Sequence, residues 1–157
     1  MTGAFQAIVW AGAACAILDG VAASVQSGLM GIKPLRLWQG VASGLLGERA
    51  FRHGWVSGSL GLLLHFVIAF TAATVFVELS RQIPFLVRVY WISGPLYGVA
   101  VFLVMSLVVV PLSARPRRPA SSEAMIVQLV IHVLFVGLPI ALATNRFIFL
   151  DQYGGRI

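Results

Sequence analysis

The stretch VYWISGPLYGVAVFLVMSLVVVPLSA, residues 89–114, holds no Asp, Glu, Lys or Arg. A helix needs about 20 mostly apolar residues to cross the hydrocarbon core of a bilayer. The stretch meets that length without a charged side chain. We therefore predict a membrane-spanning helix over residues 89–112.

Three more stretches of the same kind lie on either side of it. Residues 53–77 and 124–145 hold no Asp, Glu, Lys or Arg, and residues 4–29 hold only Asp19. No Lys or Arg precedes residue 4 and Asp19 lies inside the run, so we expect a span there rather than a secretory signal. The sequence predicts an all-α fold with one transmembrane domain over residues 1–157. That domain is a four-helix bundle with spans near residues 4–29, 55–79, 89–112 and 124–148.

The composition of the whole chain agrees with this prediction. The 157 residues are 59% hydrophobic and include only 11 basic and 5 acidic residues. A soluble domain of this length would carry roughly 39 charged residues, which argues against a water-soluble enzyme, a nucleic-acid-binding protein or a disordered tail. Lys and Arg lie at the ends of the apolar runs, where such residues contact lipid headgroups and fix topology. We expect the lipid bilayer as a partner, with bound lipid, and no nucleic acid.

The connection between the first two spans has a helical pattern of its own. Pro34 suits a helix start, and apolar residues recur after it on one face: Leu35, Trp38, Ala42, Leu45 and Leu46. We predict an amphipathic helix at the membrane interface, with Trp38 at headgroup depth. Glycines in this connection and in the second and third spans are expected to let helices pack closely: Gly40, Gly44, Gly58, Gly61, Gly94 and Gly98.

Lys and Arg are distributed unevenly between the two sides of the predicted bundle. Connections 30–54 and 113–123 share a side and hold seven: Lys33, Arg36, Arg49, Arg52, Arg115, Arg117 and Arg118. The other side holds four: Arg81, Arg88, Arg146 and Arg156. The positive-inside rule then predicts that these two connections are cytoplasmic.

Three ionisable side chains are expected deep in the bundle, where a cost of about 2.5 kcal/mol or more makes each of them informative. Counted from the same membrane face at 1.5 Å per residue, Asp19, His65 and His132 each lie about 12–15 Å inside. Gln128 precedes His132 by one helical turn. We predict that these four residues form an intramembrane polar layer.

Four roles for this layer remain open. The first is a hydrogen-bonded cluster that holds the helices together, and the second is a path or binding site for protons or a substrate. The third is a pair of histidine ligands for haem, and the fourth is a metal site with two imidazoles and a carboxylate. Cys15 is the only cysteine, so the chain forms no internal disulfide and no Cys-based zinc site.

Five segments together resemble a group of short bacterial four-span membrane proteins that are similar to the YagU-like inner-membrane proteins. The segments are PLRLWQGVASGLLG at 34–47, the span around His65, GPLYG at 94–98, PLS at 111–113, and the segment from His132 to GLPIA at 137–141. The resemblance covers most of the chain and implies four helices in a bacterial inner membrane. It transfers no catalytic residues, because none are established for the group.

No motif predicts an enzyme, since the sequence has no phosphate loop, nucleophile elbow, HExxH or CxxC. The small size, short loops and glycine-rich faces favour a non-enzymatic accessory or structural subunit of a larger membrane complex, with other membrane subunits as partners. The alternative is a small proton-linked transporter or acid-response protein that uses Asp19, His65 and His132. Haem binding by the two histidines is the third possibility.

Overall fold

The computed structural model describes residues 3–116 and 121–153, with side chains through residue 148. Three of the basic residues counted above on the two sides of the bundle lie outside the described residues: Arg117, Arg118 and Arg156. Within the described part the structure is all-α, and four helices are long and apolar enough to cross a membrane. They are α1 (Gly3–Leu29), α3 (Gly54–Gln82), a third span over Tyr90–Leu112 and a fourth over Ser122–Ile148. The predicted four-helix membrane bundle is confirmed.

The third and fourth spans each contain a widened, π-helical turn. The third comprises α5 (Tyr90–Val104), the π turn η2 (Met105–Val109) and α6 (Val110–Leu112). The fourth comprises α7 (Ser122–Ile131), the π turn η3 (His132–Gly137) and α8 (Leu138–Tyr153). Each π turn ends two residues before a proline, Pro111 or Pro139. Because proline lacks an N–H and its ring collides with the carbonyl four residues earlier, a widened turn in front of it accommodates the ring.

Short elements join the spans at the two ends of the bundle. α2 (Pro34–Leu46) and a 3₁₀ turn, η1 (Gly47–Arg52), connect α1 to α3, and α4 (Phe85–Arg88) follows α3. Pro34 begins α2, as expected from its fixed φ. Gly47 ends α2 with φ +56°, a backbone conformation that favours glycine.

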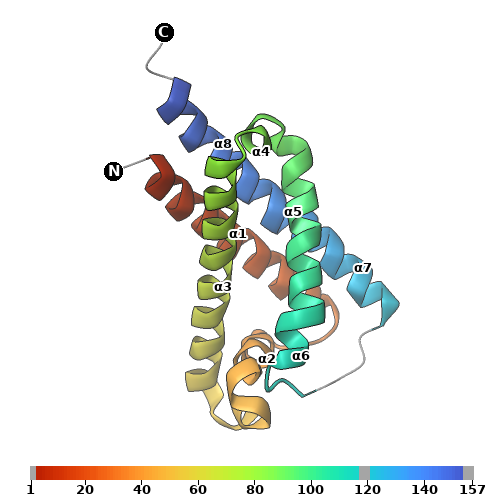
Figure 1. Ribbon diagram of the computed structural model, residues 1–157. Coiled ribbons are helices and arrows are strands. Elements are labelled where there is room, and N and C mark those ends of the chain that lie inside the picture. Colours follow the sequence, from red (N-terminus) through yellow and green to blue (C-terminus); the bar gives the residue numbers. More distant parts are fainter. Residues whose placement is uncertain (1–2, 117–120, 154–157) are drawn as a thin grey trace.

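The four spans are arranged so that α1 and α8 lie between α3 and α5. α1 packs against both α3 and α8, and α5 packs against η3 and α8. In Figure 1, α3 and α5 stand upright, α1 and the α7–α8 helix cross them obliquely, and α2 lies at the end opposite the start of α1. Tyr97 connects α5 to α3, because its hydroxyl donates to the Ala72 carbonyl oxygen at 2.7 Å.

Two glycines bring neighbouring backbones into direct contact. Gly61 of α3 lies against the Trp38 carbonyl group of α2, and Gly98 of α5 lies against the His132 carbonyl group. A Cβ atom at either position would overlap that backbone. Two more of the predicted packing glycines would place an added Cβ within 3.0 Å of a neighbour: Gly58 and Gly94.

Gly40 differs from the prediction. No atom of the described residues lies within 4 Å of the position that its Cβ would occupy, so a close-packing role for Gly40 is wrong. Gly44 makes only an ordinary contact, at 3.8 Å to the Cβ of Ser113. The close approach of α2 to the bundle depends instead on the glycines of α3.

The face that α2 turns to the bundle agrees with the predicted apolar face at Ala42 and Trp38 but not at Leu45. Its buried residues are Gln39, Ala42 and Ser43, whereas Leu45 is 64% exposed. Gln39 finds a partner inside, because its Nε2 donates to the Gly54 carbonyl oxygen at 3.1 Å. The outside of a membrane bundle is itself apolar, so a polar side chain gains more from a partner within the protein than from facing outward.

Candidate functional site

The structure brings Asp19 of α1 and His65 of α3 together inside the bundle. The Nδ1 atom of His65 lies 3.8 Å from Oδ2 of Asp19, and their side chains are only 13% and 15% exposed. Asp19 is ten residues from the end of α1 and His65 is eleven residues from the start of α3. At 1.5 Å per residue, both lie about 15 Å from the end of the bundle that carries α2.

Two further contacts fix the imidazole of His65, and Gly20 leaves room for it. Its Nε2 lies 2.9 Å from the Ala16 carbonyl oxygen, and its ring centroid is 5.3 Å from that of Trp38. A Cβ added to Gly20 would lie 3.2 Å from the same Nε2 atom, so glycine there leaves room for the ring. Because a carbonyl oxygen only accepts hydrogen bonds, Nε2 carries a hydrogen, and Nδ1 is the nitrogen that faces Asp19.

His132 and Gln128 lie in the fourth span and contact each other. The His132 side chain is buried, and its Nδ1 lies 2.9 Å from the Gln128 carbonyl oxygen and 3.3 Å from Nε2 of the same residue. Its ring meets Phe102 edge-on, with 5.7 Å between centroids. Of the two histidines, His65 is the one that comes within ion-pair distance of Asp19.

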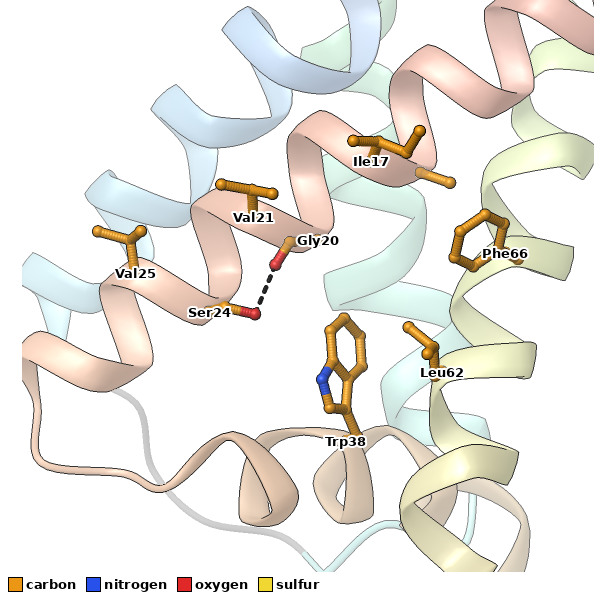
Figure 2. Close-up of a pocket in the computed structure, with 9 residues that line it drawn as sticks. Ile17, Gly20, Val21, Ser24, Val25, Trp38, Leu62 and Phe66 are labelled. Carbon is orange, nitrogen blue, oxygen red and sulfur yellow. Dashed lines mark hydrogen bonds between the residues drawn. The ribbon is translucent and has the colours of Figure 1, made fainter. Parts of the chain in front are cut away.

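An apolar groove of about 420 Å³ lies beside this pair, between α1 and α3. Figure 2 shows Gly20, Val21 and Val25 on its α1 side and Phe66 on its α3 side, with the indole of Trp38 rising from α2 between the two helices. Trp38 was predicted at headgroup depth, and that prediction is wrong. Its ring is in the bundle against His65, because Gly61 lets α2 fold back onto α3.

The pair can hold one shared proton in two ways. With Nε2 already protonated, a second imidazole proton on Nδ1 gives an imidazolium beside a carboxylate. Moving that proton to Asp19 leaves a neutral imidazole beside a carboxylic acid. At 3.8 Å the two groups are beyond direct hydrogen-bond distance, so the transfer needs a small side-chain rotation or a bridging water.

Asp19 Oδ1 is a further unusual feature of this pair. It is one of two buried side-chain oxygens without a hydrogen-bond partner among the described residues; the other belongs to Ser80. Buried polar groups in proteins are nearly always partnered. An orphaned carboxylate oxygen in a membrane span is therefore an available acceptor for a proton, a water or a ligand.

The geometry of the site gives no support to a metal site or to haem ligation. In the described part of the chain, no three His, Cys, Asp or Glu side chains are grouped as metal ligands would be. Both nitrogens of His65 are directed at protein groups, the Ala16 carbonyl and the Asp19 carboxyl. Haem ligation would require His65 to leave those contacts.

Sequence reasoning placed Asp19 and His65 at one depth, and the structure brings them together. It missed the carbonyl of Ala16 and the indole of Trp38. The contact with the Ala16 carbonyl could not be predicted from the sequence, because every residue has a carbonyl group. The contact with Trp38 could not be predicted either, because it depends on how closely α2 approaches α3. Comparison with models of protein families, with curated proteins and with solved structures gives no match to this chain.

Proposed function

We propose that this protein is a small proton-linked membrane transporter in which Asp19 and His65 form the proton-binding pair. The observation that supports it is an intramembrane carboxyl and imidazole 3.8 Å apart, with one carboxyl oxygen unpartnered. Ionisable residues inside membrane spans mark proton relays and substrate paths. His132 and Gln128 are the other two members of the predicted polar layer.

A purely structural role explains His65 better than Asp19. The hydrogen bond from His65 to the Ala16 carbonyl joins α3 to α1, and such bonds hold membrane helices together. Among the described residues Asp19 shows no comparable bond: its Oδ2 is 3.8 Å from Nδ1 of His65, and its Oδ1 has no hydrogen-bond partner. Placing a carboxyl in a span costs about 2.5 kcal/mol or more, and the contacts of Asp19 offset little of that cost.

The groove lies next to His65 of the pair. Gly20 and Trp38 both line the groove and both contact His65. A proton carrier or an apolar substrate in the groove would therefore lie next to the imidazole. Four helices enclose little space of their own, so we expect the working form to be an oligomer.

Proton flux into vesicles tests the proposal. Purified protein is reconstituted with an internal pH-sensitive dye, and a membrane potential that drives protons inward is imposed with a potassium gradient and valinomycin. We expect wild-type vesicles to acidify faster than empty ones, and Asp19→Asn and His65→Gln vesicles to resemble empty ones. Glu78→Gln and His53→Gln make the same chemical changes at exposed positions and should keep the wild-type rate. Wild-type flux in Asp19→Asn vesicles, or no flux in the wild type, overturns the proposal.

An accessory subunit of a larger membrane complex is the second candidate, favoured by the third span. Only 6% of its most apolar stretch is buried within the chain, against 28–33% for the other three spans. In a larger complex, a partner subunit would cover this surface in place of lipid. The preparation for the flux assay also tests this candidate: a complex isolated in mild detergent should contain other chains, and a protein that migrates alone contradicts it.

We place the protein in the inner membrane of a bacterial cell, with connections 30–54 and 113–123 in the cytoplasm. The resemblance to short bacterial four-span proteins supports the compartment. The excess of Lys and Arg on those connections supports the orientation.

A further inference from the structure

A second cavity lies at the α2 end of the bundle, away from Asp19 and His65. It has a volume of about 1200 Å³ and is bordered by the segment after α1, by α2, by η1 and by the end of the third span. Ligand pockets for drug-sized molecules are typically about 300–1,000 Å³. The cavity is therefore large enough for more than a simple ion.

Five charged side chains line this basic cavity: Lys33, Arg36, Glu48, Arg52 and Arg115. Four are cationic and one is anionic, which leaves three positive charges in excess. The ion pairs of the described residues are Asp19–His65 and Glu78–Arg81, so none of the five is neutralised by an opposite charge within 4.0 Å. Cations gathered in a concave site attract anions and raise their local concentration.

Arg36 is held in position for such a ligand. One of its Nη atoms donates to the Phe51 carbonyl oxygen at 3.4 Å, and its guanidinium carbon lies 5.6 Å from the centre of the Phe51 ring. These two contacts orient the guanidinium and leave its remaining N–H donors open. A planar guanidinium with free donors suits the paired oxygens of a phosphate group.

Part of the remaining lining is apolar, beside the hydroxyls of Ser27 and Ser43. Leu37, Phe51 and Val110 border the same cavity as the cations. α1 ends at Leu29 and the third span ends at Leu112, so the cavity is at the depth where spans leave the hydrocarbon and lipid headgroups begin. A ligand that satisfies both parts of the lining has a phosphate at one end and hydrocarbon at the other.

We propose that the basic cavity is a binding site for an anionic phospholipid. Its phosphate group lies among Arg36, Arg52, Arg115 and Lys33, and its glycerol and upper acyl carbons lie against the apolar lining. Glu48 accepts hydrogen bonds from headgroup hydroxyls. This proposal is independent of the proton-linked function, since the cavity shares no lining residue with the Asp19–His65 groove.

Lipid retention measured by native mass spectrometry tests the proposal. Wild-type protein in micelles with equal amounts of phosphatidylglycerol and phosphatidylcholine of one chain length should retain the anionic lipid preferentially. Arg52→Gln/Arg115→Gln removes two lining cations that make no other side-chain contact shown by the structure, and should weaken that retention at least about tenfold. Arg49→Gln/Arg81→Gln changes the net charge equally outside the cavity and should retain the lipid as the wild type does.

Three results would overturn the proposal. One is equal retention of the two lipids by the wild type, and another is a loss in the control variant as large as in Arg52→Gln/Arg115→Gln. The third comes from soluble sn-glycerol 3-phosphate added as a competitor. If it binds as tightly as phosphatidylglycerol, the site recognises a free phosphate compound and the hydrocarbon contributes nothing. Equal helix content of the variants by circular dichroism excludes unfolding as the cause of any loss.

Discussion

At the scale of single residues, His65 is expected to stabilise the fold and Asp19 is not. His65 joins two helices through the Ala16 carbonyl at 2.9 Å, whereas Asp19 has an unpartnered oxygen. We expect His65→Ala to lower the free energy of unfolding in mixed micelles by about 0.6–2 kcal/mol. Asp19→Asn should leave it unchanged or raise it by about 1–2 kcal/mol, because an intramembrane carboxyl is lost. His53→Ala, at an exposed position, is the control, and a marked loss of stability in Asp19→Asn would favour the structural role.

The shared depth of Asp19 and His65 was predictable from the sequence, but their contact was not. Counting from the ends of apolar runs put Asp19, His65 and His132 in one layer, because helical rise is fixed. Which of the two histidines approaches Asp19 depends on rotation about each helix axis. Gly20 decides this in part by leaving space for the His65 ring, but a glycine in an apolar run does not indicate by itself which side chain fills the space beside it.

At the scale of elements, α2 and α3 approach each other through Gly61. An added Cβ at Gly61 meets the Trp38 carbonyl group, which is backbone and cannot rotate away. We expect Gly61→Ala to lower the free energy of unfolding by about 1–3 kcal/mol and to change the environment of Trp38. Gly40→Ala, where nothing lies within 4 Å, should raise it by about 0.5–1 kcal/mol, since alanine is the better residue inside a helix. Equal losses in both variants, measured by chemical denaturation, would contradict the observed packing of α2.

The hydrophobic pattern located α2 and placed Ala42 and Trp38 on one apolar face, but it did not predict that Gln39 and Ser43 are buried. In a bilayer both sides of the helix are apolar, so Gln39 gains more by turning inward to the Gly54 carbonyl oxygen. Leu45 turns outward. The buried face of α2 therefore combines apolar and polar residues. The π turn that carries His132 ends two residues before Pro139 and packs against Gly98.

At the scale of the whole molecule, the two ends of the bundle differ in charge. The end with α2 carries the basic cavity, while the opposite end carries the exposed Glu78–Arg81 pair, with Nη1 and Oε2 2.9 Å apart. A cytoplasmic leaflet rich in anionic lipid favours the more basic end. Four of the seven basic residues counted on connections 30–54 and 113–123 line the cavity, so the charge count and the cavity describe the same basic end of the bundle: Lys33, Arg36, Arg52 and Arg115.

Cysteine labelling in oriented vesicles checks that orientation. In a Cys15→Ala background, Arg49→Cys and Gln82→Cys place thiols at exposed positions on either side of α3. A membrane-impermeant maleimide applied to right-side-out vesicles should label Gln82→Cys and spare Arg49→Cys, and inside-out vesicles should reverse the result. Because α3 separates the two positions, labelling of both from one side would mean that α3 does not cross the bilayer. The reverse pattern in both preparations would keep the four-span topology and show that three excess cations on one side do not set the orientation of this chain.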